Sequence, residues 1–386
     1  MEVSNPSGLG ERAEGLKLDR RAFIVSALGL ATASELVKVQ AKHSTQRIEA
    51  LYVRAIVLDS LMAGGPAVDE KIALAAGLTG GVVDLDGSPR TTTVARHDLA
   101  EWDKAFNDPA RRFLKVLQAD DFARAKAERR FAVVLASQNA SILGPGSISN
   151  SDENIENLRA FHEAGLRLLL LTYTDSNSLG DGYNERSDGG LKNLGRIVVP
   201  EMNRLGMLID VSHSGERTTL DAIALSSRPV SVSHAGCRAL DRNLRNKSDA
   251  VIRALAEKGG YFGVYNMTLW MTRKPTSSVE DIVDHIDHAA KIGGIDTVGF
   301  GSDQGIIANP IPNAQYVPDL QEFARQNIGR PASDPIDFKH VYAEDINRPD
   351  RLLIIARALS RRGYRGNAIE KILGGNFIRT FRGAVG

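Results

Sequence analysis

Residues 207–234 read MLIDVSHSGERTTLDAIALSSRPVSVSH, and this stretch decides the fold. An apolar run at Met207–Val211 and another at Pro229–Ser233 flank a longer segment with helical character. Short runs rich in β-branched residues, separated by helical segments, are typical of parallel strands joined by helices. The stretch therefore predicts one strand–helix–strand unit of an α/β protein.

The same alternation runs through most of the chain. Eight strands are predicted, at Val53–Leu58, Gly81–Leu85, Phe131–Ala136, Leu166–Thr172, Met207–Val211, Pro229–Ser233, Tyr261–Tyr265 and Thr297–Gly301. The clearest helix is predicted over 278–291, with a capping box formed by Ser277 and Glu280 at its start. Eight such units favour a closed (β/α)8 TIM barrel over an open doubly wound sheet. Residues 304–386 are predicted to form a C-terminal helical extension that covers the barrel.

Composition narrows the classes of function. The 386 residues carry 48 Lys+Arg and 47 Asp+Glu, a formal net charge of +1. Such a balance excludes a disordered or acidic-tail protein and gives no basis for a nucleic-acid partner. The single cysteine, Cys237, excludes an intrachain disulfide and a Cys-based zinc site. Any metal must then be held by histidine and oxygen ligands.

The first 45 residues differ from the rest. Arg20-Arg21-Ala22-Phe23-Ile24 precedes a short apolar run that ends near Ala33. The run is too short to span a membrane, and with the two arginines it resembles a twin-arginine export signal. We expect 1–45 to be signal and tether, cleaved after Ala33 or Ala41, and 46–386 to be one domain in the periplasm. The alternative is an N-terminal amphipathic helix that happens to carry two arginines.

Polar residues gather where the predicted strands end, which is where a TIM barrel builds its active site. Two neighbouring strands end in Ser-His, at His213 and His234, and the eighth ends at Asp303. Two imidazoles with a carboxylate across the mouth are suited to a divalent metal, with Asp303 as ligand or general base. The alternative is that both histidines end strands and bind loop carbonyls.

Two further residues are substrate-binding candidates. Arg245 lies in the loop after the sixth strand, where a guanidinium could hold a substrate carboxylate, although it could equally be a solvated loop arginine. Asn266 ends the seventh strand. Cys237 is interpreted as a small buried residue and not as a ligand or a reactive thiol.

These residues lie within motifs that resemble the membrane (renal) dipeptidase family. The matching stretches are Gly190–Arg196, Glu201–His213, Ser233-His234, Arg245–Asp249, His285–His288, Val298–Asp303 and Gly374–Arg379. The resemblance covers roughly residues 51–386 and implies an amidohydrolase-type (β/α)8 barrel that holds two zinc ions and cleaves dipeptides. By position it implies that His213 and His234 bind the second zinc and that Arg245 grips the substrate carboxylate. Asp303 would assist with the substrate amine and the proton.

The chain departs from the family pattern at the first zinc. The strand-one motif Asp-Gly-His-Asn-Asp appears as Asp59-Ser60-Leu61-Met62-Ala63, so Leu61 and Ala63 replace two ligands. Gln138 replaces the bridging glutamate, and Tyr173 replaces the catalytic histidine. A two-zinc centre is therefore not expected. One ion remains, held by His213 and His234 with Gln138 or Asp303, while Tyr173 would donate a hydrogen bond to a developing oxyanion.

Three functions stay open at this point. The first is an exported hydrolase that cleaves dipeptides or related small amides with one divalent metal, zinc or another. The second is a remodelled barrel enzyme with lyase, isomerase or lactonase chemistry on a small carboxylate. The third is a binding protein that uses the pocket without catalysis. The family often forms homodimers, so the resemblance also implies a dimer.

Overall fold

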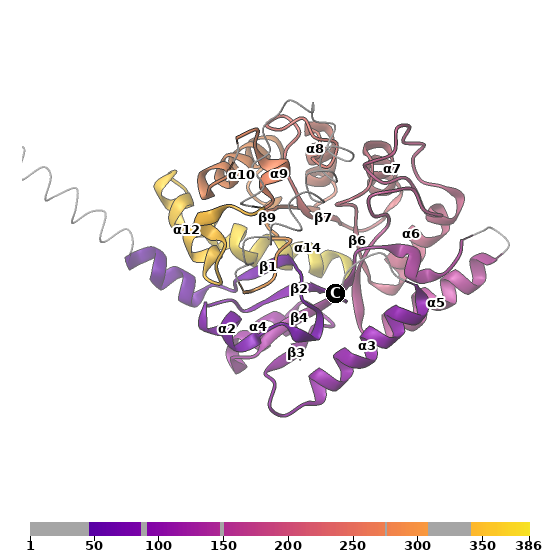
Figure 1. The fold of residues 1–386 in the computed structure, drawn as a ribbon, viewed down its shortest axis with the longest axis horizontal. Helices are drawn as coiled ribbons and strands as arrows, with labels where there is room; N and C mark the ends of the chain where they lie inside the picture. Colours follow the sequence, from indigo (N-terminus) through magenta and orange to yellow (C-terminus); the bar gives the residue numbers. More distant parts are fainter. Residues whose placement is uncertain (1–45, 86–90, 147–149, 275, 308–340) are drawn as a thin grey trace, which may run out of the picture. The chain divides into compact units, whose positions relative to one another are not determined.

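Eight parallel strands form the centre of the structure, a computed structural model that describes residues 46–85, 91–146, 150–274, 276–307 and 341–386 (Figure 1). They are ordered β1-β2-β4-β5-β6-β7-β8-β9. Their bounds are β1 Leu58–Met62, β2 Gly80–Asp84, β4 Phe131–Ser137, β5 Leu166–Leu170, β6 Leu208–Asp210, β7 Val230–Ala235, β8 Tyr261–Val264 and β9 Val298–Phe300. A short strand, β3 (Phe113–Lys115), pairs with β4 beside this path. All of the pairings are parallel, as continuous apolar strands predict.

Hydrogen bonds between the first strand, β1, and the last strand, β9, close the sheet into a barrel. The backbone N–H of Asp303, just after β9, donates to the carbonyl oxygen of Leu61 in β1 at 3.0 Å. The Ser60 hydroxyl, also in β1, donates to the carbonyl of Phe300 in β9 at 2.9 Å. The predicted α/β class and (β/α)8 TIM barrel are therefore confirmed.

Helices surround the strands, and each strand is followed in the chain by at least one helix (Figure 1). The α-helices are α2 Glu70–Ala75, α3 Thr92–Asn107, α4 Asp120–Glu128, α5 Ser151–Glu163, α6 Asn193–Leu205, α7 Glu216–Leu225, α8 Asp249–Glu257, α9 Thr268–Met271, α10 Val279–Gly293, α12 Arg351–Arg361, α13 Gly366–Glu370 and α14 Asn376–Ala384. Short 3-10 turns lie at Gly65–Ala67, Ala140–Leu143 and Glu344–Ile346, and a π-turn at Lys371–Gly375 joins α13 to α14. Helices α12 to α14 form the predicted C-terminal extension.

Apolar residues form two cores. The larger lies between the strands and the surrounding helices. The smaller fills the barrel interior, where Leu168 and Leu208 pack with Phe377 and Phe381 of α14. Phe377 meets the ring of Tyr261, at the start of β8, edge-on at 5.3 Å between centroids. Because Tyr261 begins its strand, α14 covers the end of the barrel opposite the strand ends that carry the polar residues.

Some predicted boundaries are wrong. The first strand, predicted at Val53–Leu58, begins only at Leu58, and residues 48–54 are helical. An apolar run without clear periodicity fits a helix as well as a strand. The capping box of α10 is formed by Ser278 and Asp281, one residue later than predicted. The short strand β3 was not predicted.

The predicted export signal, at 1–45, lies outside the described residues. In the part of the chain that the structure describes, no helix combines the length and the apolar character needed to cross a membrane.

Candidate active site at the mouth of the barrel

His213 and His234 meet at the mouth of the barrel. His213 follows β6, His234 lies in β7, and both are at least 96% buried, with 4% and 0% of their surface exposed. Their Nε2 atoms are 3.0 Å apart. Burial, together with the cations Arg245 and Lys247, holds the pKa of both imidazoles well below the usual range. Both rings are therefore neutral at pH 7, which is the state that binds a metal.

A serine and aspartate network orients this pair. The Ser233 hydroxyl lies 2.8 Å from Nδ1 of His234, and the Ser212 hydroxyl accepts the backbone N–H of His234 at 3.2 Å. The carboxylate of Asp210 accepts the N–H of Ser233 at 2.6 Å. A bond at Nδ1 fixes the ring that presents Nε2, as is usual for a metal-binding histidine. Nδ1 of His213 is buried without a hydrogen-bond partner among the described residues.

Arg245 lies behind the two histidines. Its side chain is fully buried, and its Nη1 and Nη2 groups donate to the carbonyl oxygens of Ser212 at 2.6 Å and His234 at 3.1 Å. Rings surround the guanidinium, with centroids 5.8 Å away for Tyr183, 5.3 Å for Tyr265 and 5.7 Å for Trp270. The two terminal NH2 groups of the guanidinium are therefore hydrogen-bonded to the backbone that carries the histidines. The grip on a substrate carboxylate that the resemblance implied stays a prediction, and Nε of Arg245 is buried without a hydrogen-bond partner among the described residues.

Tyr173 and Asp303 are half-buried side chains at the mouth of the barrel. The Tyr173 ring stacks on His213, with centroids 4.3 Å apart and planes at 17°. Burial, reinforced by Asp303, raises the pKa of Tyr173 above its usual range, so the phenol keeps its proton. Burial also raises the pKa of Asp303 to about 7; Arg245 opposes this shift, and Asp84 and Asp59 add to it. Asp303 can therefore take up and release a proton near neutral pH.

Gln138 is tied to a carboxylate. Its backbone N–H donates to Oδ1 of Asp84 at 3.1 Å, and its Nε2 group donates to Oδ2 at 3.4 Å. Its Oε1 atom is buried and has no hydrogen-bond partner within the described residues. The amide nitrogen is thus held by Asp84, which leaves one neutral oxygen ligand unused.

Asn266, predicted to bind substrate, is held inside the protein. Its Nδ2 group donates to Oε1 of Gln304 at 3.0 Å, and its Oδ1 atom accepts the N–H of Ala343 at 3.1 Å. The side chain is fully buried. Asn266 therefore links the end of β8 to the segment before α12, with both ends of its amide engaged.

The structure adds a buried ion pair that the sequence did not reveal. Arg351 at the start of α12 places Nη1 3.6 Å from Oδ2 of Asp59 in β1, and both side chains are fully buried. Oδ1 of Asp59 accepts the N–H of Ser302 at 2.7 Å. Burial, partly offset by Arg351, raises the pKa of Asp59 to about 6. No motif marks Arg351, and it is remote in sequence from its partner.

The separation of the two histidine nitrogens is compatible with one shared ion. In a tetrahedral zinc site, two nitrogens at 2.0–2.1 Å from the metal lie about 3.3 Å apart, close to the histidine separation. Leu61 and Ala63 offer no ligand atoms for another ion. Within the described ranges, no group of three or more His, Cys, Asp or Glu side chains is placed to hold a metal. The two histidines remain candidate ligands, and Gln138 and Asp303 remain the candidate oxygen donors predicted from the sequence.

A parallel barrel with buried imidazoles and a carboxylate at its mouth is the arrangement expected of a hydrolase. The chain belongs to the membrane dipeptidase family, peptidase family M19, whose model matches residues 36–330. The resemblance seen in the sequence is thereby confirmed.

Named relatives agree with this family. Dipeptidase tcpJ of Claviceps purpurea is 29% identical over 262 residues, which is 67% of this chain and 54% of the relative. The uncharacterized dipeptidase C965.12 of Schizosaccharomyces pombe is 32% identical over 246 residues, 59% of this chain and 56% of the relative. The chain spans about half the length of the curated relatives it matches.

Solved structures share the fold. An amidohydrolase from Pseudomonas aeruginosa has a TM-score of 0.74 at 24% identity, over 88% of this chain and 99% of that one. A metallopeptidase from Rhodobacter sphaeroides, solved with a phosphinate mimic of the dipeptide L-Ala-D-Ala, has a TM-score of 0.66 at 20% identity, over 86% and 99%. At these identities the likeness establishes the barrel alone.

Proposed function

We propose that this chain is a dipeptidase-type hydrolase that cleaves dipeptides or related small amides, with one divalent ion, zinc or another, between His213 and His234. The observation that carries the proposal is the 3.0 Å separation of the two buried Nε2 atoms. Gln138 Oε1 is the further ligand that we assign to the ion. An ion bound there would polarise the amide carbonyl and lower the pKa of a bound water.

The chain's own residues supply the proton chemistry. Asp303, with a pKa of about 7, accepts a proton from the attacking water and returns it to the leaving amine. Tyr173 stays protonated and donates a hydrogen bond to the oxyanion that develops on the carbonyl oxygen. Arg245 acts indirectly, because it holds the carbonyl of His234 and the carbonyl that precedes His213.

A second candidate is a remodelled enzyme that acts on a small carboxylate by lyase, isomerase or lactonase chemistry. The observation that favours it is the replacement of hydrolytic ligands by Leu61, Ala63 and Gln138 while Arg245 is retained. A dipeptide panel separates the candidates, because turnover at ordinary rates counts against the second.

The experiment measures metal content and dipeptide hydrolysis of the purified full chain. We expect one ion per chain, loss of hydrolysis on chelation and recovery on adding zinc. The variant H213A/H234A should lose both the ion and the activity, whereas H97A, which removes an exposed histidine of α3, should keep both. Hydrolysis that persists in metal-free protein or in H213A/H234A contradicts the proposed metal site.

Tyr173→Phe tests the oxyanion donor. The substitution removes only the hydroxyl and keeps the ring that stacks on His213. Loss of one preorganised donor lowers kcat by about 10²-fold. We expect that loss with the metal content unchanged, and an unaltered kcat contradicts the role assigned to Tyr173.

We also propose that residues 1–45 direct export to the periplasm and that the mature protein forms a homodimer. The arginine pair before a short apolar run supports the first proposal, and the family resemblance supports the second. R20K/R21K should retain the protein in the cytoplasm, and N-terminal sequencing of the exported protein should begin after Ala33 or Ala41. Light scattering at several concentrations tests the dimer, and a constant monomer mass contradicts it.

A further inference from the structure

A cavity lies at the end of the barrel opposite the histidines. It has a volume of about 670 Å³. Its walls come from segments that precede strands, among them Gly77–Thr79 before β2, Arg112 before β3 and Arg129-Arg130 before β4. The cavity is therefore separated from the mouth by the packed barrel interior. Its volume is in the range of cavities that hold small molecules.

The charged residues that line this cavity are all cations. They are Lys71, Arg112, Lys126, Arg129 and Arg130, and the lining contains no Asp or Glu. Arg130 pairs with Glu128 at 3.3 Å and also donates to the carbonyl of Phe113. The other four side chains make no ion pair with any described residue. Four uncompensated cations around one concavity favour an anion there, because their fields add.

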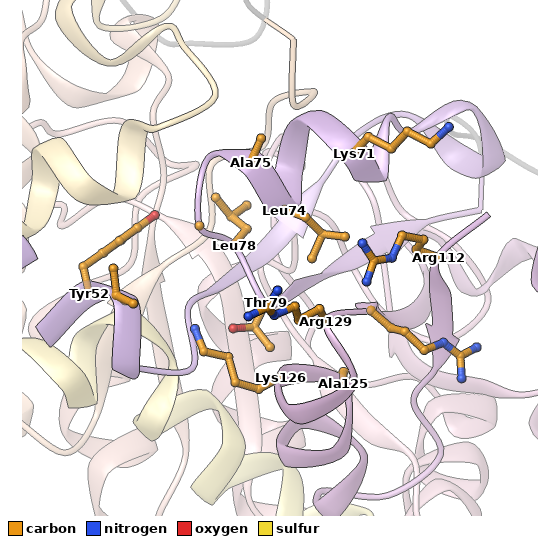
Figure 2. A pocket seen from close by; sticks show the side chains of 13 residues that line it. Tyr52, Lys71, Leu74, Ala75, Leu78, Thr79, Arg112, Ala125, Lys126 and Arg129 are labelled. Atoms are coloured by element: carbon orange, nitrogen blue, oxygen red, sulfur yellow. The ribbon is translucent and has the colours of Figure 1, made fainter. Parts of the chain in front are cut away.

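Lys126 and Arg129 hold the central positions (Figure 2). Lys126, on α4, is half-buried and directed toward Tyr52, while Arg129 lies beside Thr79. Lys71 points away from the middle of the cavity. Burial lowers the pKa of Lys126, and no acid offsets this effect. A lysine in this position lacks the partner that half-buried ammonium groups normally have.

The backbone of Arg129 is held in a costly conformation. Arg129 follows the end of α4 with φ 51° and ψ 45°, the left-handed region in which helices usually place glycine. Among the described residues, only Arg129 and Asp303 combine a side chain with positive φ. Asp303 lies at the mouth, where the reaction is proposed. Backbone strain of this kind concentrates at functional sites, so an arginine in place of a glycine here is a second observation in favour of binding.

We propose that this cavity binds a phosphate-bearing anion, with Lys126 and Arg129 as the central contacts and Arg112 beside them. A guanidinium binds phosphate through two parallel hydrogen bonds, and an ammonium adds a point charge. The apolar wall made by Tyr52, Leu74 and Leu78 accommodates a non-polar part of the ligand. The phosphate is either part of a soluble metabolite or the headgroup of an anionic lipid. The site is independent of the function proposed for the mouth.

The test is calorimetric titration of the purified full chain with inorganic pyrophosphate and with ADP at 50 mM NaCl. A parallel arm measures co-sedimentation with vesicles of 30% phosphatidylglycerol in phosphatidylcholine, against vesicles of phosphatidylcholine alone. The variant is K126Q/R129Q. The matched control is R253Q/K291Q, which removes two exposed cations of α8 and α10 that have no ion pair in the described structure. Melting temperatures show whether each variant is folded.

We expect one pyrophosphate or ADP per chain, with affinity at least tenfold weaker in K126Q/R129Q and within twofold of native in R253Q/K291Q. Binding should also weaken as NaCl rises to 300 mM. Vesicle binding that depends on phosphatidylglycerol and is lost in K126Q/R129Q, without binding of the soluble probes, assigns the phosphate to a lipid. If K126Q/R129Q does not fold, R112Q removes one exposed guanidinium and should weaken binding at least threefold. The proposal is overturned if no probe binds at millimolar concentration, or if the folded pocket variant binds as tightly as the native chain.

Discussion

Replacing Arg245 with methionine separates two roles for this residue. In the structure, Arg245 binds the carbonyls of Ser212 and His234 and is fully buried, so we expect Arg245→Met to destabilise the fold and disturb the histidine pair. In the role implied by the family resemblance, the guanidinium grips a substrate carboxylate. That role predicts a stable variant with a raised KM.

The magnitude follows from the two hydrogen bonds. Each bond from a charged donor contributes about 1.5–3 kcal/mol, and methionine fills most of the volume while removing a buried charge. We take the net loss as about 3 kcal/mol. With about 2.1 cal/mol/K of unfolding entropy per residue, a unit the size of Ile48–Gly386 loses roughly 4 °C in Tm for that change.

The assay is thermal unfolding of the full chain, with hydrolysis of dipeptides and of their C-terminal amides measured alongside. We expect Arg245→Met to lower Tm by roughly 4 °C and to reduce kcat on both substrate types, while Arg242→Met, an exposed arginine in the same loop, changes neither. An unchanged Tm, together with a KM that rises only for free carboxylates, would falsify the positioning role.

Three further substitutions test the buried charges and the strained backbone. Asp303→Asn should abolish the rise in activity through pH 7. Folding raises the pKa of Asp303 from 3.8 to about 7, so the native chain loses stability as this carboxyl ionises with rising pH. The Tm of the variant, measured relative to the Tm of the native chain, should therefore be higher at pH 8.5 than at pH 5. Arg351→Met leaves the Asp59 carboxylate without its cation and should cost about 3 kcal/mol at pH 8; the loss should shrink at pH 5, where Asp59 is protonated, and an equal loss at both pH values argues against the ion pair. Arg129→Gly removes about 1–2 kcal/mol of left-handed strain against about 0.4–1 kcal/mol of added unfolded-chain entropy, so it should raise stability by up to about 1.6 kcal/mol in denaturant unfolding; a clear loss would show that the strain is absent.

The sequence predicts the barrel well because each strand is locally recognisable. A buried parallel strand needs an apolar run, and turn residues or helix caps bound it, so seven of the eight runs coincide with most of a strand and the first shares only Leu58 with β1. The first run does not distinguish helix from strand, and the predicted strand shifts to Leu58–Met62. β3, which lies beside the order of eight strands, was not predicted.

The candidate site is predictable only in part, because position along a strand does not determine what a side chain contacts. His213 and His234 are found because their strands are neighbours and end alike. Arg245 and Asn266 also follow strands, but their partners are atoms of other segments, and no local pattern reveals those bonds. Arg351 reaches Asp59 through packing of the C-terminal extension.

Arg351 supplies a positive charge beside Asp59, which belongs to the same motif as Leu61 and Ala63. The carboxylate of Asp59 lies in the strand where Leu61 and Ala63 replace ligands, and it is too deeply buried to remain charged without a cation nearby. A guanidinium at 3.6 Å supplies that charge permanently, at every pH at which the fold persists. Arg351 also binds the Ser302 hydroxyl at 3.0 Å, next to Asp303, so the same cation braces the segment that carries the proposed general base. Arg351, which contacts both Asp59 and Ser302, therefore stabilises this part of the mouth without a metal ion. We expect metal removal to affect only the part of the site formed by His213 and His234.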